Sequence, residues 1–202
     1  QDPVPTGNFV HLHVHTQYSL LQGAIHVEDL VARTAEMGMS AVAITDTNNL
    51  FGAIDFYLAA KDKKIKPIIG VDAWYLENGY TGALASANAM QGPASQNFKP
   101  KFHQLVLLAK NLDGYQNLCK LVTDAYKKAP PPVKGQPVLP KFLIDWASLD
   151  LYGKNIIVLS GGLRGEIPYK ILSGEEAEAA QIAKKFQKRF GSDFYLELQD
   201  NG

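Results

Sequence analysis

Short apolar runs alternate with amphipathic stretches along most of the chain, and this order constrains the fold more than any other feature. Short apolar runs are typical of buried strands, and apolar residues three and four apart are typical of helices. Strands that alternate with helices favour an α/β fold with a largely parallel sheet and helices outside it. The expected strands cover residues 9–14, 40–45, 68–71, 104–109, 156–159 and 194–198.

The stretches between these strands carry helical spacing. The first expected helix, over residues 27–35, should end at Gly38, where a left-handed cap is favourable. A second, over residues 50–63, has Ile54 and Leu58 four positions apart. Ser173 and Glu176 have the spacing of a capping box before a helix that carries Phe186. Further helices are expected over residues 113–126 and 144–148.

One large domain over residues 9–202, after a flexible lead at 1–8, is the simplest organisation for 202 residues. Residues 77–100 are rich in Gly, Ala, Ser, Asn and Gln, which favours an insertion loop. Residues 129–140 hold five prolines, which favours an extended linker inside the domain.

Composition excludes several classes of protein. Lys plus Arg and Asp plus Glu are both 20, so no basic surplus indicates nucleic-acid binding. Cys119 is the only cysteine, which excludes an intrachain disulfide framework and favours a cytoplasmic location. No apolar run approaches the roughly 18 to 20 residues that a membrane span needs.

Three histidines alternate in the first expected strand. His11, His13 and His15 should therefore face the same side, where neutral imidazoles could bind zinc, manganese or iron. Such a metal can activate water for hydrolysis. The alternative is that these histidines are exposed or hydrogen-bonded without a metal, and for the histidines alone we favour it.

Five motifs in order give that pattern a context: HLHVHTQYSLLQG, AITDTNNLFGAIDFY, IKPIIGVDAWY, LVLLAKNLDGYQNL and IIVLSGGLRGEI. Over nearly the whole chain they resemble the polymerase and histidinol phosphatase (PHP) domain family. The LFGAIDFY and LLAKNLDGYQNL segments resemble its polymerase subgroup, in which the domain opens the large subunit of bacterial replicative DNA polymerases.

The resemblance implies a distorted seven-stranded β/α barrel with up to three metal ions at the carboxyl ends of its strands. Active members hydrolyse phosphoesters. The family's final Asp-x-His motif would lie beyond residue 202, so we expect a PHP barrel that is truncated at its C-terminal end.

Residue by residue, the resemblance assigns His13 and His15 to the family's His-x-His pair and Asp72 to a ligand position that is usually Glu. These three are the expected residual metal ligands. His11, Asp46 and His103 are weaker candidates. Asp46 is favoured as an Asx turn or a helix N-cap, and His103 should face the opposite side from Gln104.

Other ligand positions of the family carry side chains that bind metals poorly. Gln22 stands where polymerase members often have Asp, and Thr47 and Gln104 stand where His is usual. Gly161 and Gly162 lie where active members have His or Cys. Arg164 could meet a phosphate or lie exposed at a helix start.

Two hypotheses follow from this reduced ligand set. The favoured one is a structural and partner-binding domain of a replicative polymerase, with an eroded site that could hold Zn or Mn. Its expected partners are the polymerase core of the same polypeptide, a proofreading exonuclease subunit, and DNA through the Mg-dependent parent enzyme, a nucleotidyltransferase. The alternative is an active metal-dependent 3′–5′ exonuclease or phosphoesterase.

A free-standing phosphatase is disfavoured, because it would need the His and Asp motifs that phosphatase members of the family keep and this chain lacks.

Overall fold

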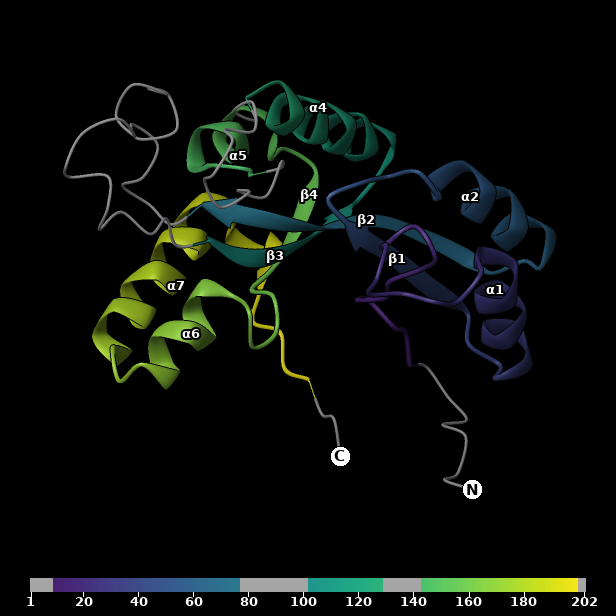
Figure 1. The fold of residues 1–202 in the computed structure, drawn as a ribbon, viewed down its shortest axis with the longest axis horizontal. Helices are drawn as coiled ribbons and strands as arrows, with labels where there is room; N and C mark the ends of the chain where they lie inside the picture. Colours follow the sequence, from purple (N-terminus) through teal and green to yellow (C-terminus); the bar gives the residue numbers. More distant parts are fainter. Residues whose placement is uncertain (1–8, 77–101, 129–142, 200–202) are drawn as a thin grey trace, which may run out of the picture.

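The computed structural model describes residues 9–76, 102–128 and 143–199. Expected segments 1–8, 77–100 and 129–140 lie outside these ranges. The elements in chain order (Figure 1) are α1 Val27–Glu36, β1 Ala41–Thr47, α2 Ala53–Asp62, β2 Lys66–Leu76, β3 Phe102–Ala109, α4 Leu112–Lys128, α5 Trp146–Tyr152, β4 Ile156–Leu159, α6 Glu166–Leu172, α7 Glu176–Phe190, a 3-10 helix Gly191–Asp193, and β5 Phe194–Tyr195.

The strands form one five-stranded sheet in the order β1-β2-β3-β4-β5. The pairs β1–β2 and β4–β5 are parallel, but β3 is antiparallel to both of its neighbours. The expectation of a largely parallel sheet is therefore wrong at β3. The register shows the reason: Leu76 at the end of β2 pairs with Phe102 at the start of β3, so the two strands run in opposite directions from this pair.

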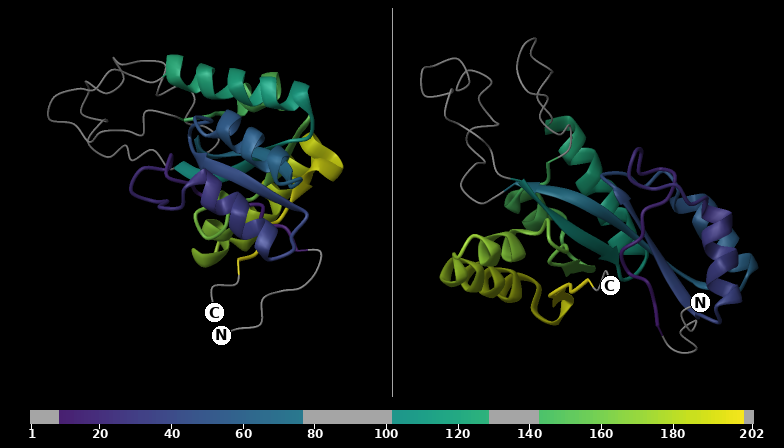
Figure 2. Two further views of the ribbon diagram at one scale, coloured as in Figure 1. Left: turned by 90° about the vertical axis from the view of Figure 1, so that its right-hand side faces the viewer. Right: turned by 60° about the horizontal axis from the view of Figure 1, so that its bottom comes forward.

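Helices cover the sheet in groups. Figure 1 shows α1 and α2 at one end of the sheet and α6 and α7 at the other, and both views in Figure 2 keep these pairs together. The largest core cluster joins β2, β3 and β4 to α4, α5 and α7. Leu118 and Leu121 of α4 are completely buried in it. Each such leucine stabilises the fold by about 1.5–3 kcal/mol.

The segment expected as the first strand, residues 9–14, is extended but is not a strand. It lies beside β1, where Ala43 N donates to His11 O over 2.9 Å and Thr45 N donates to Val14 O over 2.8 Å. Between these bonds the segment advances three residues while β1 advances two. The extra residue breaks the ladder and the regular alternation of side chains. The last expected strand is also shorter, since β5 ends at Tyr195.

The helices lie close to the ranges expected from the sequence, but the residues that they bury differ in part from expectation. Gly38 has a φ of +70°, which confirms the left-handed position after α1. In α2, however, Ile54 and Leu58 are exposed, and the helix instead buries Ala53, Phe56 and Ala60.

The capping box expected before α7 is wrong. Ser173 belongs to the end of α6, where its N–H donates to Tyr169 O over 3.0 Å. The N-cap of α7 is Glu175, which makes no side-chain capping bond. Within the described ranges, no helix is both long and apolar enough to cross a membrane.

Candidate metal centre

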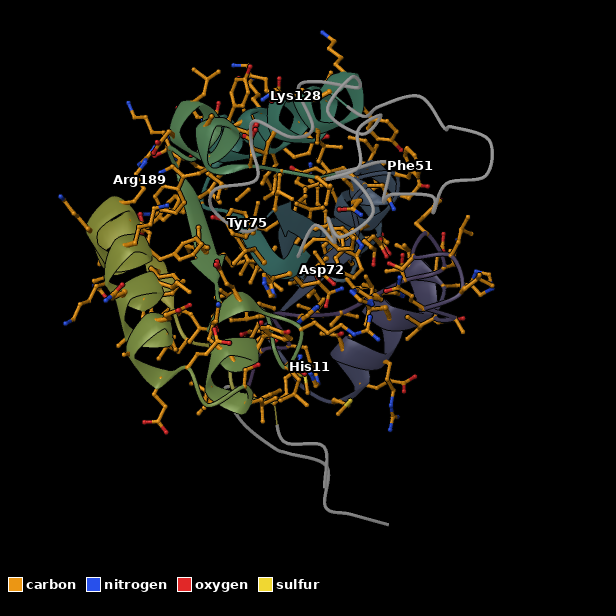
Figure 3. The ribbon with its side chains drawn as sticks, turned by 60° about the vertical axis from the view of Figure 1, so that its left-hand side comes forward. His11, Phe51, Asp72, Tyr75, Lys128 and Arg189 are labelled. Carbon is orange, nitrogen blue, oxygen red and sulfur yellow. The ribbon has the colours of Figure 1, made fainter. Side chains whose placement is uncertain are left out.

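Two histidines and one aspartate meet at Asp72 of β2, opposite the last residue of β1. His15 Nε2 lies 3.0 Å from Asp72 Oδ2, and His13 Nε2 lies 3.4 Å from the same oxygen. One ligand atom from each of the three residues lies within 4.8 Å of the others. The structure thus brings together the three residues that the resemblance assigns as residual ligands. In Figure 3, Asp72 lies near the middle of the molecule and His11 is seen apart from it.

Glu197 is a fourth member that the sequence analysis missed. Its Oε1 lies 2.7 Å from His13 Nδ1 and accepts a 2.8 Å hydrogen bond from Gln199 Nε2. Ser160 Oγ fixes the backbone by accepting from Glu197 N over 2.9 Å. The signal was present in the sequence: Tyr195, Glu197 and Gln199 alternate with apolar residues, so their side chains should share one side.

Two buried carboxylate oxygens in this group have no hydrogen-bond partner among the described residues. They are Asp72 Oδ1 and Glu197 Oε2. An unsatisfied buried carboxylate oxygen is costly, and a bound cation would remove that cost. Imidazole nitrogens together with carboxylate oxygens suit zinc or manganese. The donor set therefore fits a divalent metal ion.

Hydrogen bonds inside the group shift its protonation. Burial alone would lower the pKa of His13, but the hydrogen bonds with Asp72 and Glu197 outweigh it and raise that pKa from 6.5 to about 9. Burial would raise the pKa of Asp72, yet the hydrogen bonds from His13 and His15 hold it below its ordinary value. The pKa of Glu197 is lowered against burial in the same way, chiefly by His13. Without a metal, His13 carries a proton between two carboxylates at neutral pH.

Two weaker candidates lie elsewhere. His11 is exposed, and its ring packs edge-on against Phe9 with centroids 4.8 Å apart. The extra residue between His11 and Val14 explains why the predicted shared face of the three histidines is wrong. His103 is buried in β3 with its ring 5.2 Å from Tyr169. It does not line the cavity that Gln104 lines, in agreement with the expected opposite orientation.

Asp46 holds the loop that follows His15. Its Oδ1 accepts from Thr16 N over 2.7 Å and from Ser19 Oγ over 2.6 Å, and its Oδ2 accepts from Thr16 Oγ1 over 2.8 Å. The expected Asx turn instead belongs to Asn49, whose Oδ1 accepts from Phe51 N over 3.1 Å. Asp46 is therefore a structural anchor rather than an Asx turn or an N-cap.

At several positions where the resemblance places metal ligands, this chain has other residues, which contact one another or are packed against a neighbouring side chain. Thr47 Oγ1 donates to Gln22 Oε1 over 3.0 Å, so two positions without metal-binding side chains bond to each other. At Gly162, an added Cβ would lie 2.6 Å from Gln199 Oε1. Gln199 thus occupies the space that a side chain at position 162 would need.

A cavity of about 770 Å³ lies beside His13, His15 and Asp72. Its lining includes the ligand group and several neutral or cationic side chains: His13, His15, Asp72, Gln22, Gln104 and Arg164. Two exposed leucines, Leu21 and Leu163, also line it. The cavity can admit a small molecule next to the candidate metal ligands.

The fold and the site define a mixed α/β protein with a candidate His/Asp metal centre. The family model for the PHP domain matches residues 11–201, and the chain belongs to this family. PHP domains are similar to metal-dependent phosphoesterases, in keeping with the group formed by His13, His15 and Asp72.

Sequence relatives give a narrower comparison. The chain is 41% identical over 195 residues to the DNA polymerase III subunit alpha of Aquifex aeolicus, covering 96% of this chain and 16% of that protein. It is 40% identical over 194 residues to the subunit of the same name in Borreliella burgdorferi, covering 96% of this chain and 15% of the relative. The chain therefore spans about a sixth of the length of these relatives.

A solved structure gives a likeness in fold alone. It is an amidohydrolase from Chromobacterium violaceum, described with bound SO4 and no metal. The TM-score is 0.51 at 11% identity, and the match covers 93% of this chain and 84% of the other.

Proposed function

We propose that this chain is the PHP domain of a bacterial DNA polymerase III α subunit, where it is a structural and partner-binding module with a reduced metal site. Identity of about 40% to two such subunits over 96% of the chain supports this assignment. The parent would be a cytoplasmic, Mg-dependent DNA-directed DNA polymerase. The domain would contact the polymerase core of the same polypeptide and a proofreading exonuclease subunit, and would meet DNA through the parent protein.

The hydrogen bond between Thr47 and Gln22 carries the structural interpretation. A cluster of several metal ions needs ligand side chains on all sides of the ions. Here an amide and a hydroxyl satisfy each other at two of the positions where the resemblance places ligands. The three ligands that remain, His13, His15 and Asp72, with Glu197 bonded to His13, are enough for one ion.

That ion would be zinc or manganese. When bound, it would supply Lewis-acid chemistry and activate water. Asp72 would hold it through the oxygen that now has no hydrogen-bond partner, and His13 and His15 through Nε2. Glu197 would orient His13 through Nδ1, as partners of metal-bound histidines commonly do.

Metal content and nuclease activity test the proposal together. We expect at most one zinc or manganese ion per chain by elemental analysis, and its loss in His13→Ala. His26→Ala is the matched control, because His26 is exposed and does not line the cavity. We expect no chelator-sensitive cleavage of a single-stranded primer end by this chain or by the full-length subunit.

An active 3′–5′ exonuclease is the second candidate. The buried oxygens Asp72 Oδ1 and Glu197 Oε2 favour it, because two carboxylates could share a cluster of more than one ion. Chelator-sensitive cleavage by the full-length subunit, abolished in His13→Ala and kept in His26→Ala, would establish this candidate and overturn the structural one.

The five strands are, in the same proposal, part of a seven-stranded barrel that a longer chain would complete. A second cavity of about 1040 Å³ supports this view. It lies between the extended segment at residues 9–13 and the residues at and after β5, and apolar side chains such as Ile68, Leu108 and Leu159 line it. Further strands could fill this space and pair with the outer strands of the sheet.

A further inference from the structure

The first residue after β1, Asn48, has a backbone conformation that few side chains adopt. Its φ is +56°, in the left-handed region, where asparagine is one of the few residues besides glycine that is tolerated. β1 pairs in parallel with β2 up to Thr47, which lies opposite Asp72. The left-handed turn therefore takes the chain away from the sheet directly beside a candidate metal ligand.

Asn48 nevertheless makes two hydrogen bonds to β2. Its N–H donates to Asp72 O over 2.9 Å, as a further residue of β1 would do. At the other end of β1 the regular pattern continues with a bond from Lys66 N to the backbone carbonyl of Ser40. The equivalent donor at this end is Trp74 N, but it donates to Asn48 Oδ1, over 2.9 Å. The side-chain amide oxygen thus replaces a backbone carbonyl that the left-handed turn has directed elsewhere.

These two bonds close a gap along one side of β2. The strand continues to Leu76, whereas β1 ends at Thr47. Ile144 pairs with β2 from Tyr75 onward, as an isolated parallel bridge. Asn48 lies between these two partners, so the backbone polar groups of β2 stay paired where one neighbour ends and the next begins.

The part of β2 that Asn48 holds includes Asp72. On its other side Asp72 pairs with Val106 of β3, so its backbone is fixed from both sides. Its side chain is completely buried, and Oδ2 lies 3.4 Å from His13 Nε2 and 3.0 Å from His15 Nε2. A metal ligand must be held to within about 0.5 Å of its productive position. The direction of this carboxylate therefore depends on how firmly the strand below it is held.

We propose that Asn48 is a positioning residue for the candidate metal centre. It fixes the backbone of β2 at Asp72, so that the Asp72 carboxylate faces His13 and His15 before any ion binds. Asn48 acts through Asp72 and is not itself a ligand. The proposal adds a residue outside the ligand set, and it rests on the proposed function only for the presence of an ion.

NMR of the metal-stripped 202-residue chain, labelled with ¹⁵N, tests the position of Asp72 directly. Asn48→Gly removes Oδ1 while glycine adopts the same left-handed φ, so the variant should keep the fold, and circular dichroism checks this. We expect the Trp74 amide to exchange with solvent at least about tenfold faster, because its acceptor is gone. The ring N–H of His15 that donates to Asp72 Oδ2 should change its chemical shift.

Asn155→Gly is the matched control. Asn155 is also half-buried with a left-handed φ, of +60°, and it lies outside the cavity. It accepts a hydrogen bond from Lys110 N through its backbone carbonyl, which glycine keeps. This variant makes the same backbone change as Asn48→Gly, so it should alter the Trp74 exchange rate less than about twofold and leave the His15 ring signal in place.

Zinc affinity, measured by competition with a chromophoric chelator, gives the second readout. Asn48→Gly should weaken zinc binding by at least about tenfold, as loss of a group that orients a metal ligand commonly does. Asn155→Gly should change it less than about twofold. Asn48→Asp keeps an acceptor oxygen and tolerates the left-handed φ, so it should restore slow exchange of the Trp74 amide and bind zinc more tightly than Asn48→Gly.

Three results would overturn the positioning role. They are a Trp74 amide that stays protected in Asn48→Gly, a His15 ring signal that does not move in this variant, and equal losses of zinc affinity in Asn48→Gly and Asn155→Gly. An unmodified chain that binds no zinc would count against the metal site of the proposed function instead. The two NMR signals need no metal, so they decide the role of Asn48 in either case.

Discussion

At the scale of single residues, Asp72 organises the candidate site. One of its carboxylate oxygens lies within 3.4 Å of both His13 and His15, and the other has no hydrogen-bond partner in the described ranges. His13 in turn bridges Asp72 and Glu197. Two carboxylates around a protonated histidine are stable without a metal, and the same atoms can hold a cation once His13 loses its proton. A proton and a metal ion therefore compete for this group.

That competition predicts a pH dependence for the metal-free protein. The pKa of His13 is raised from 6.5 to about 9, so its contribution to stability is complete below about pH 6.5 and is lost as the pH rises through 9. The pKa values of Asp72 and Glu197 are lowered, so their contribution is present above their ordinary values and is lost in acid. Stability with chelator present should be greatest near pH 5–6.5.

Urea unfolding at pH 6 and pH 9 measures the effect, which should be at most about 3 kcal/mol for His13. With zinc present the loss at pH 9 should be smaller, since a metal prefers the deprotonated ring. The His13→Gln variant should show a flatter profile in chelator. An equally steep loss between pH 6 and 9 in that variant would show that His13 is not responsible.

The pair Gln22 and Thr47 predicts a gain of metal binding. Their side chains meet at 3.0 Å, and Gln22 lines the cavity with His15 and Asp72. The double variant Gln22→Asp with Thr47→His would place a carboxylate and an imidazole there. We expect zinc content to rise above that of the unmodified chain, by up to one ion. Gln22→Leu with Thr47→Val is the control, because it removes the hydrogen bond without adding ligands; unchanged zinc in both variants would refute the prediction.

At the scale of elements, the loop after His15 is fixed from β1. Asp46 is 2% exposed and accepts three hydrogen bonds from Thr16 and Ser19, while Ser19 Oγ accepts from Thr47 N over 3.0 Å. The loop begins one residue beyond the second histidine of the site. The orientation of the His15 side chain therefore depends on β1, a strand that carries none of the candidate ligands His13, His15 and Asp72.

Replacing Asp46 by alanine tests this dependence. The change leaves the N–H and O–H donors of Thr16 and the hydroxyl of Ser19 without their acceptor, so we expect a loss of roughly 3 kcal/mol in the free energy of unfolding. Metal affinity should fall with it, because His15 loses its support. Asp55→Ala is the matched control: Asp55 accepts one 3.3 Å bond from Tyr18 at the surface, and its loss should cost under about 0.5 kcal/mol. Similar losses in both variants would contradict the anchoring role.

The sequence predicted elements better than the orientation of their side chains. Apolar runs and Gly38 identified most strands and the end of α1, because burial and the left-handed cap are local properties. The shared face of His11 with His13 was wrong, since one extra residue opposite β1 depends on tertiary packing. Ile54 and Leu58 indicated a helix but not its buried face. The partner of Asp46, about 30 residues away in the chain, leaves no local pattern.

At the scale of the whole molecule, the candidate site lies where distant parts of the chain meet. His13 and Glu197 are 184 residues apart in sequence and 2.7 Å apart in space. Between the segments that carry them lies the cavity of about 1040 Å³. Leu196 and Leu198 line it and are 62% and 95% exposed. The cavity therefore presents apolar side chains that further strands of a longer chain could bury.

A longer form of the chain, with the two further strands that the barrel proposal requires, should bury these leucines. Full burial of each contributes about 1.5–3 kcal/mol, so the extended protein should unfold at a higher urea concentration and bind less of a dye that reports exposed apolar surface. An extension of equal length made of glycine and serine is the control for length alone. Leu196→Ser separates packing from other effects of extension: it should destabilise the longer form by at least about 1.5 kcal/mol and have little effect on the 202-residue chain, where the side chain is already mostly in water. Equal effects of the substitution on both forms would mean that the extension does not cover this cavity, and the seven-stranded arrangement would lose its main support.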